Sequence, residues 1–352
     1  MKGLHEGESR GGSALAGRVR SGDRLALARS LTLIENETQD GLEALAALYP
    51  LTGKAHIIGV TGAPGTGKST LVNELAQAFR RNPLEGRDKA TTVAIVAVDP
   101  SSPFSGGAIL GDRIRMRDLA GDSGVFIRSM ASRGALGGLA RGTAGVVEAL
   151  DAAGFDKILI ETVGAGQAEV DIARTAQTTL VVAAPGLGDD IQALKAGILE
   201  IADILVVNKA DLPGAENTQR ALRAALEMGR APDPMATHGT DPNHPTARES
   251  AVDSWAVPVL ATVATQGEGI DELVEAINDH RENLIDTGEL VKRERARVRA
   301  EMQMLLRDLL AERFLERESD ARFEAALERV LTRAVDPRQA VAQLVLETEA
   351  EA

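Results

Sequence analysis

A glycine-rich run, GAPGTGKST at residues 62–70, matches the pattern G-x-x-x-x-G-K-[ST]. A β-branched stretch at 56–60 precedes it and an apolar-periodic stretch at 69–80 follows it, so a strand and a helix flank the run. Its glycines let backbone N–H groups surround phosphate oxygens at a positive helix terminus. Lys68 is expected to reach the β- and γ-phosphates and the Ser69 hydroxyl to bind Mg²⁺. The predicted phosphate site comprises Gly62, Ala63, Pro64, Gly65, Thr66, Gly67, Lys68, Ser69 and Thr70.

A second motif, NKAD at residues 208–211, indicates which base is bound. It follows the strand-like run 204–207 at the carboxyl edge of the predicted sheet, where ligands of such folds bind. An aspartate accepts two hydrogen bonds from the N1–H and N2 amine of guanine, and adenine lacks that donor pair. Asp211 is therefore expected to bind guanine, while Asn208 and Lys209 support the site and cover the ring. GTP is favoured over ATP.

Two acidic residues follow strands at the same predicted edge, Asp99 and Glu161. In P-loop enzymes an acid at this position holds Mg²⁺ directly or through water. Most GTPases place Asp in a D-x-x-G motif, whereas Glu161 precedes Gly164 in this chain. Together with Lys68, these two acids are the predicted catalytic residues. No side chain is an obvious base for the attacking water, so a module that binds GTP without hydrolysing it stays open.

The elements that position these residues alternate between strands and helices. Helical stretches, for example 69–80, 138–150 and 216–228, separate most of the β-branched runs. Apolar strands that alternate with helices favour a mainly parallel sheet covered on both faces. The fold class is therefore α/β, a P-loop NTPase. The predicted strands are 56–60, 92–98, 157–160, 179–183, 204–207 and 258–261.

Four segments are expected along the chain. Residues 1–22 are rich in Gly, Ser and charge and are predicted to be flexible, and residues 23–50 to form two short helices broken near Gly41. Residues 51–281 form the GTPase domain, and 282–352 a helical region. In this last region an apolar seam at helical spacing must bury against the domain or a second copy of the chain. The seam consists of Val298, Met302, Leu305 and Leu309.

The composition narrows the possible partners. The formal net charge is −13, whereas proteins that bind nucleic acids or anionic membranes usually carry basic surfaces. Only 2% of residues are aromatic, which leaves few side chains for stacking on bases. The absence of cysteine excludes disulfides and thiolate zinc sites and suits a reducing cytoplasm. No apolar run approaches the length of a membrane span. We expect a cytoplasmic protein without nucleic-acid or membrane partners.

The stretch PGLGDDIQALKAG, residues 185–197, has two interpretations. Acids at a helix start are favoured by the helix dipole, so a solvated helix terminus explains them. The strand before this stretch also ends at the nucleotide edge, so the stretch suits a nucleotide-sensitive switch equally well. Its polar candidates are Asp189, Asp190, Gln192 and Lys195.

Several longer runs resemble the MeaB/ArgK family of G3E GTPases. They are DPSSPFSGGAILGDRIRM at 99–116, VFIRSMASRGALGGLA at 125–140, ETVGAGQAEVD at 161–171 and NKAD. The resemblance covers roughly residues 20–340. It implies a GTP-hydrolysing metallochaperone of methylmalonyl-CoA mutase, an adenosylcobalamin enzyme. It also implies a homodimer formed by the C-terminal helices, and hydrolysis that is slow alone and faster with the mutase.

The resemblance also implies roles for particular residues. Mg²⁺ would be surrounded by Ser69, Asp99, Asp112 and Glu161, and the base would be touched by Val263, Ala264 and Thr265. Val263-Ala264 stands where the family usually has Ser-Ala, so a side-chain hydrogen bond from the first position is lost and a backbone contact can survive. The segment 185–197 would be a third switch that relays the nucleotide state to the mutase. Mg²⁺ and GTP or GDP are the expected ligands, without a tightly bound organic cofactor.

Two rival functions stay open at this point. A nickel-insertion-type G3E GTPase commonly carries His- or Cys-based metal sites, but this chain has 5 scattered histidines and no cysteine. An ATPase that energises amino-acid transport is disfavoured by the guanine motif.

Overall fold

The structure is a computed structural model, and it describes residues 10–82, 90–100, 119, 121–132, 138–162, 172, 175–186, 199–230, 255–317 and 320–350. The chain divides into two compact units, residues 1–293 and 294–352. The first unit contains the sheet and the sequence motifs. The second consists of helices.

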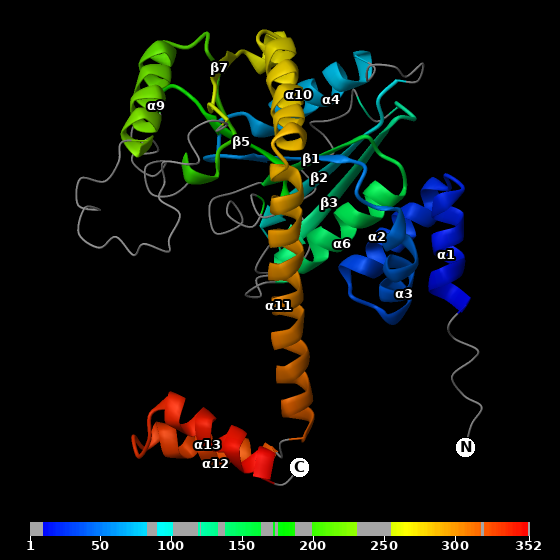
Figure 1. The fold of residues 1–352 in the computed structure, drawn as a ribbon, viewed down its shortest axis with the longest axis vertical. Coiled ribbons are helices and arrows are strands. Elements are labelled where there is room, and N and C mark those ends of the chain that lie inside the picture. The colour runs from blue at the N-terminus through cyan, green and yellow to red at the C-terminus, as the bar shows by residue number, and fades with distance from the viewer. Residues whose placement is uncertain are drawn as a thin grey trace. The chain divides into compact units, whose positions relative to one another are not determined.

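A single 7-stranded sheet organises the described part of the first unit, with strand order β3-β2-β4-β1-β5-β6-β7 (Figure 1). Every strand pairing in it is parallel, so all carboxyl ends lie at one edge. The predicted α/β fold with a mainly parallel sheet is confirmed. The strands are β1 (His56–Thr61), β2 (Val93–Pro100), β3 (Val125–Ser132), β4 (Lys157–Thr162), β5 (Thr178–Ala183), β6 (Ile204–Asn208) and β7 (Val259–Thr262).

Strand β3 is absent from the strands predicted by the sequence. It is an edge strand that pairs only with β2, and polar residues such as Arg128 and Ser129 interrupt its apolar pattern. A half-exposed edge strand does not need the continuous apolar run that marks a central parallel strand. For this reason the hydrophobic pattern alone did not reveal it.

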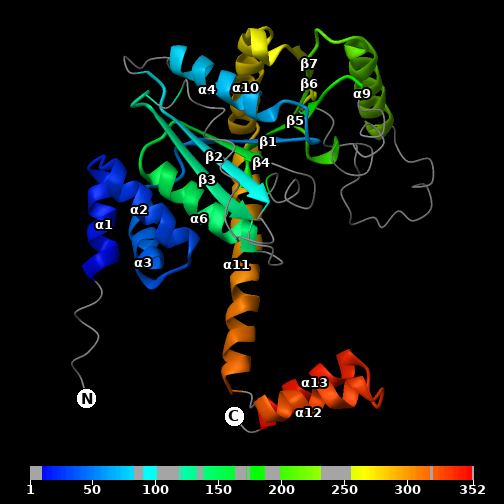
Figure 2. The same cartoon turned by 180° about the vertical axis from the view of Figure 1, so that it is seen from behind.

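Helices cover both faces of the sheet. In both views α4 (Lys68–Arg81) and α10 (Ile270–Asp286) lie together on one face, and α6 (Gly138–Ala152) lies with α2 (Arg24–Glu35) on the other (Figures 1 and 2). A further helix, α9 (Ala215–Arg230), packs against β6 and β7. The predicted helices 69–80, 138–150 and 216–228 are confirmed, with ends that differ by one or two residues.

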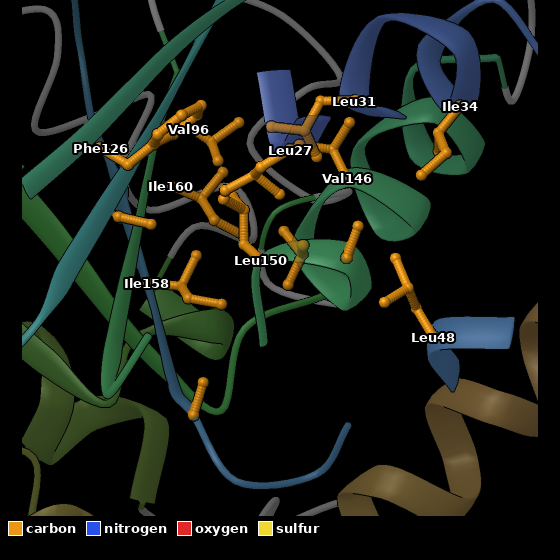
Figure 3. Close-up of a cluster of buried hydrophobic side chains, with 14 of the residues drawn as sticks. Leu27, Leu31, Ile34, Leu48, Val96, Phe126, Val146, Leu150, Ile158 and Ile160 are labelled. Carbon is orange, nitrogen blue, oxygen red and sulfur yellow. The ribbon is translucent and has the colours of Figure 1, made fainter. Parts of the chain in front are cut away.

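The core follows the alternation of side chains along each strand. On β4, Ile158 and Ile160 face the α2 and α6 layer, whereas Leu159 belongs to the cluster with α4 and α10. Figure 3 shows the first cluster, in which Leu27 of α2 and Leu150 of α6 gather against these strands. Both faces are buried, so the sheet is held rigidly beneath its carboxyl edge.

The N-terminal helices correct two expectations. Residues 10–20 form helix α1 (Arg10–Arg20) rather than a flexible segment, and Leu15 and Val19 are buried. Residues 1–9 lie outside the described part of the chain. The predicted break near Gly41 falls instead between α2 and α3 (Gln39–Leu48), where Thr38 caps α3. Gly41 lies within α3, where an added Cβ would sit 2.4 Å from the backbone of Leu33, so it permits close helix packing. A short 3-10 helix, η1 (Tyr49–Leu51), follows α3.

The second unit begins within α11 (Glu289–Arg317) and continues through α12 (Asp320–Leu331) and α13 (Pro337–Ala350). Its small buried core contains Ala326, Ala340 and Leu344. The predicted boundary at 281/282 lies inside α10, a dozen residues before the observed division between the units. The described residues contain no helix with the length and apolar character needed to cross a membrane.

The apolar seam predicted on α11 is largely exposed. Met302, Leu305 and Leu309 keep 65%, 41% and 52% of their surface accessible. The described helices of the second unit therefore do not cover the seam.

Candidate nucleotide site

Two glycines shape the loop between β1 and α4. Gly62 has a φ of 137°, and an added Cβ would lie 2.1 Å from the carbonyl oxygen of Val182 on β5. Gly67 caps α4 with a φ of 92°, and its Cβ would lie 2.4 Å from the Asn208 amide nitrogen. A side chain at either position would be strained and would collide. The loop can therefore curl tightly against the carboxyl edge of the sheet.

Lys68 lies within that curl. It is the first residue of α4 and is only 6% exposed. Its Nζ donates hydrogen bonds to the carbonyl oxygens of Gly62 at 2.6 Å and Ala63 at 3.0 Å. The ammonium group and the positive end of α4 thus lie together at the loop, an arrangement that attracts phosphate oxygens.

Ser69 and Glu161 meet between α4 and β4. The Ser69 hydroxyl donates to Glu161 Oε1 at 2.5 Å, and Glu161 is 1% exposed. A hydroxyl and a carboxylate are hard oxygen ligands of the kind that Mg²⁺ prefers, so these residues fit that ion. Beside them, the Thr162 hydroxyl donates to the Thr61 hydroxyl at 3.3 Å and connects the ends of β4 and β1.

The other two predicted magnesium ligands differ in how far the structure describes them. The backbone of Asp99 belongs to β2, two residues beyond Ala97, and Ala97 is aligned with Glu161. Asp99 therefore emerges at the same edge as Glu161, although its side chain lies outside the described part. Asp112 lies outside the described residues altogether.

Asn208 joins the guanine motif to the phosphate loop. Its buried Nδ2 donates to the carbonyl oxygen of Thr66 at 2.9 Å. Its Oδ1 accepts hydrogen bonds from the Thr262 hydroxyl at 3.2 Å and from the Ala264 backbone N–H at 3.1 Å. One side chain thus holds together the phosphate loop, the end of β7 and the loop that follows β7.

Lys209 and Asp211 of the guanine motif differ in their contacts with the rest of the protein. Lys209 has a left-handed φ of 57°, uncommon outside glycine, and its Nζ donates to the Gly65 carbonyl oxygen at 2.8 Å. Asp211 is exposed, and no described residue forms a hydrogen bond with it. Its carboxylate is therefore available to a ligand.

The loop Val263-Ala264-Thr265, which the resemblance places at the base, also makes contacts within the protein. The Val263 amide donates to the Glu268 carbonyl oxygen at 3.0 Å, and the Ala264 amide is engaged by Asn208. Thr265, within the 3-10 helix η4 (Ala264–Gln266), is exposed. The first two residues thus support Asn208 and the loop, and Thr265 is the member left facing outward.

Sequence reasoning missed two supporting groups at this site, the Thr262 hydroxyl and the Thr66 carbonyl. Thr262 is the last residue of β7, directly before the Val263-Ala264-Thr265 loop. A hydroxyl at a strand end beside the base loop was the only available signal. Its partner lies 54 residues away in sequence, so no local pattern reveals the pairing.

The switch candidates follow β5, which lies between β1 and β6 in the sheet. Its chain therefore leaves at the nucleotide edge, as expected, and Gly186 has a φ of 88°. The candidates Asp189, Asp190, Gln192 and Lys195 lie outside the described residues.

Comparisons with known proteins agree with this site. A family model described as "Methylmalonyl Co-A mutase-associated GTPase MeaB" matches residues 27–319. A Pyrococcus abyssi protein, provisionally described as a GTPase, is 44% identical over 94% of this chain and 94% of its own length. A mouse protein named methylmalonic aciduria type A homolog, mitochondrial, is 30% identical over 96% of this chain and 80% of its own length.

A solved structure resembles the chain over nearly its whole length. The crystal structure of a LAO/AO transport system kinase covers 97% of this chain and 98% of its own, with 26% identity and a TM-score of 0.65. The fold found from the coordinates and the family found from the sequence are thus consistent.

Proposed function

The chain belongs to the MeaB family of GTPases, and from this premise we propose that it is a cytoplasmic, GTP-driven chaperone of adenosylcobalamin-dependent methylmalonyl-CoA mutase. The observation that carries the proposal is the family match across residues 27–319, which includes every motif of the site. The mouse relative, whose name refers to methylmalonic aciduria, supports it over 96% of the chain.

The site residues divide the work of binding and hydrolysing GTP. Lys68 neutralises charge on the β- and γ-phosphates, and the amides at the start of α4 supply further hydrogen bonds to them. Asp211 accepts the two guanine N–H groups, while Asn208 keeps the base loop against the phosphate loop. Mg²⁺, when bound, would be held by Ser69 and Glu161 and would neutralise charge on the phosphate oxygens.

The contact between Ser69 and Glu161 suggests how this pair follows the nucleotide state. The hydroxyl donates to the carboxylate at 2.5 Å, and both groups keep lone pairs that can bind an ion together. Glu161 is the fifth residue of β4, and the loop that follows it begins at the nucleotide edge. A change at Glu161 can therefore pass to the chain that follows β4, and GTPases use segments after strand ends as nucleotide-sensitive switches.

The proposal is tested with the mutase from the same organism. The chain, loaded with GDP or with a non-hydrolysable GTP analogue, is passed with the purified mutase over a size-exclusion column. We expect co-elution that depends on the nucleotide, and GTP turnover that rises when the mutase is added. Lys68→Ala, which should bind the nucleotide more weakly, serves as the matched control. No co-elution in either state, together with unchanged turnover, would remove the mutase from the proposal.

The segment 185–197 is proposed to carry the nucleotide signal to the mutase. The support is that β5 ends at the nucleotide edge and that Gly186 allows an unusual backbone conformation there. Gln192→Ala and Lys195→Ala should leave GTP affinity and unassisted turnover nearly unchanged. Stimulation by the mutase should fall by about tenfold or more if the lost coupling is about 1–3 kcal/mol. Full stimulation in both variants would return this segment to a solvated helix start.

We further propose a homodimer through the C-terminal unit. Its helices expose apolar side chains that a second copy of the chain can cover. Light scattering should give twice the mass of the 37.0 kDa chain, and Leu306→Glu with Leu310→Glu should give the monomer mass. A monomer in the unchanged protein would contradict this part of the proposal. The exposed residues include Met302, Leu306, Leu310, Phe323, Leu331 and Leu346.

The rival functions receive less support. The transport-kinase description belongs to a structure of 26% identity, and the NKAD motif at residues 208–211 supports guanine over adenine. No particular observation favours nickel insertion. Turnover of GTP and ATP measured side by side separates the first rival from the proposal.

A further inference from the structure

A second group of polar side chains lies at the edge of the sheet opposite the nucleotide site. It forms where β1, β4, β5 and β6 begin, beneath α10 and the first turn of α11. The proposed function uses none of these residues. They are strongly buried, with exposed fractions of 0% for His56, 2% for Lys157, 0% for Thr178, 7% for Asp203 and 0% for His280.

Successive contacts join these residues into one row, which we call the polar chain. At one end Lys157 Nζ lies 2.7 Å from Asn278 Oδ1 and 3.2 Å from His56 Nδ1. His56 Nε2 lies 2.7 Å from the Thr178 hydroxyl oxygen. That hydroxyl lies 2.9 Å from His280 Nδ1, and His280 Nε2 lies 3.3 Å from Asp203 Oδ1.

The Asp203 end determines the direction of the hydrogen bonds. Its carboxylate accepts from the Thr179 amide at 2.8 Å and from Arg293 at 2.9 Å. Burial raises the pKa of Asp203, but interactions with His280 and Arg293 outweigh burial and hold the pKa below its usual value. Asp203 is therefore an anion, which only accepts hydrogen bonds, and His280 Nε2 faces it at 3.3 Å without a well-aligned hydrogen bond between them.

The donor and acceptor roles of neighbouring groups in the polar chain depend on one another. With a proton on His280 Nε2 and none on its Nδ1, Nδ1 accepts from Thr178 and the Thr178 oxygen accepts from His56 Nε2. His56 Nδ1 is then an acceptor, and Lys157 donates to it at the other end.

The protonation state of Lys157 determines whether each of its N–H groups finds a hydrogen-bond acceptor. A neutral amine has two N–H groups, and the polar chain offers two acceptors, His56 Nδ1 and Asn278 Oδ1. An ammonium group has three, and no third oxygen or nitrogen acceptor contacts Nζ among the described residues. The Phe79 ring, 5.0 Å from Nζ, attracts the ammonium charge but only partly replaces the missing acceptor.

The charges around Lys157 also oppose its ammonium form. Burial lowers the pKa of Lys157 to about 7, and Arg281 on α10 acts in the same direction. Asp156, in the turn before β4, opposes them. Burial likewise holds the pKa of His56 well below its usual value, and the nearby Lys157 adds to that effect. A proton added to this region therefore meets no favourable site on these two residues.

The polar chain connects helices to the sheet. Asn278 and His280 belong to α10, and Arg293 in α11 donates both to Asp203 and to the Gln177 carbonyl oxygen at 2.9 Å. Arg281, also on α10, donates to the Lys54 carbonyl oxygen at 3.0 Å. The link between α10 and α11 is thus attached to the sheet through groups whose hydrogen bonds depend on protonation.

We propose that the polar chain is a pH-sensitive latch, which holds α10 and the first turn of α11 against the sheet while Lys157 is uncharged and loosens them when Lys157 takes up a proton. It acts at the edge remote from the nucleotide, and it does not depend on the identity of the protein partner.

The direction in which stability changes with pH follows from the difference between the Lys157 pKa in the folded and unfolded states. The folded protein releases the Lys157 proton at about pH 7, whereas an unfolded chain keeps it until about pH 10.4. Between these values the unfolded state binds one more proton, so stability rises with pH. The equilibrium constant for folding should increase up to about tenfold per pH unit from this group. Asp203 changes only in the acid range, outside this window.

The first test measures unfolding by urea at several pH values between 7.5 and 9.5. The unchanged protein should gain stability across this range. Lys157→Met keeps the side-chain length without a proton and should flatten the gain, whereas Lys292→Met, at an exposed lysine of α11, should preserve it. Constant stability in the unchanged protein, or an equal slope in Lys157→Met, would overturn the proposal.

The second test breaks the polar chain at its centre. Thr178→Val removes the hydroxyl with little change in shape, and Thr178→Ser retains it. Hydrogen exchange at pH 8.5 should show lower protection of α10 and residues 289–293 in the valine variant only, with α4 as the internal reference. In the unchanged protein the same amides should lose protection relative to α4 at pH 6. Equal protection in the two variants, or no change with pH, would show that the residues do not act as one latch.

Discussion

Asn208→Ala separates support of the base loop from contact with the nucleotide. The change deletes the three hydrogen bonds that Asn208 makes with Thr66, Thr262 and Ala264. At about 1 kcal/mol net for each bond, the loss is about 3 kcal/mol. The site is buried, so partners left unsatisfied raise this toward about 5 kcal/mol.

The expected result has two parts. Thermal or urea unfolding should show the loss of stability, and affinity for a fluorescent GDP analogue should fall because the base loop is no longer held to the phosphate loop. Thr262→Val deletes only one of the bonds and should cost about 1 kcal/mol with a smaller loss of affinity. Asn217→Ala, at an exposed asparagine of α9, is the matched control and should change stability by less than about 0.5 kcal/mol.

Two outcomes would refute this reasoning. If Asn208→Ala lost stability but bound GDP as tightly as the unchanged protein, the contact between the two loops would be structural only. If Thr262→Val cost as much as Asn208→Ala, the hydroxyl contact rather than the amide would hold the loops together.

Three further predictions concern the same site. Asp211→Asn should shift the base preference from guanine toward xanthine, because the amide donates to the O2 carbonyl that replaces the exocyclic amine; unchanged preference in a paired GTP and XTP titration would exclude Asp211 from the base site. Lys68→Ala should weaken GTP and GDP binding, whereas Glu161→Ala should spare GDP binding and impair turnover and its Mg²⁺ dependence; an equal loss of GDP affinity in both would make Glu161 structural. Gly67→Ala should cost about 1–2 kcal/mol of stability because its backbone is left-handed. It should also lower GDP affinity in calorimetry, because the added Cβ collides with the Asn208 amide. Wild-type affinity and stability in this variant would contradict the observed loop geometry.

The local patterns of the sequence were sufficient for the main elements of the first unit. Buried parallel strands appear as continuous apolar runs, and the Gly62–Thr70 loop has a spacing that only one backbone geometry explains. The edge strand β3 and helix α1 escaped detection because each is stabilised by contacts rather than by its own pattern. In α1 the buried hydrophobic residues are Leu15, Ala16 and Val19, and they stand among glycines and arginines that favour disorder.

The support of the predicted site residues could not be read in the same way. Motif spacing placed Asn208 near a guanine base, but it did not reveal that Asn208 holds the Thr66 carbonyl or that the Ala264 amide is already engaged. These bonds join residues 56 to 142 positions apart, and sequence spacing carries no information about such distances.

Local patterns predict which chemistry is possible, because a phosphate loop, a guanine motif and acids at strand ends each depend on residues a few positions apart. The contact between Ser69 and Glu161 arises from tertiary packing instead, as does the row formed by His56, Lys157 and His280 at the opposite edge. The physical reason is that a parallel sheet brings the starts of distant strands together and excludes water from them. Burial and hydrogen-bond partners, which set the protonation of these groups, therefore exist only in the folded chain.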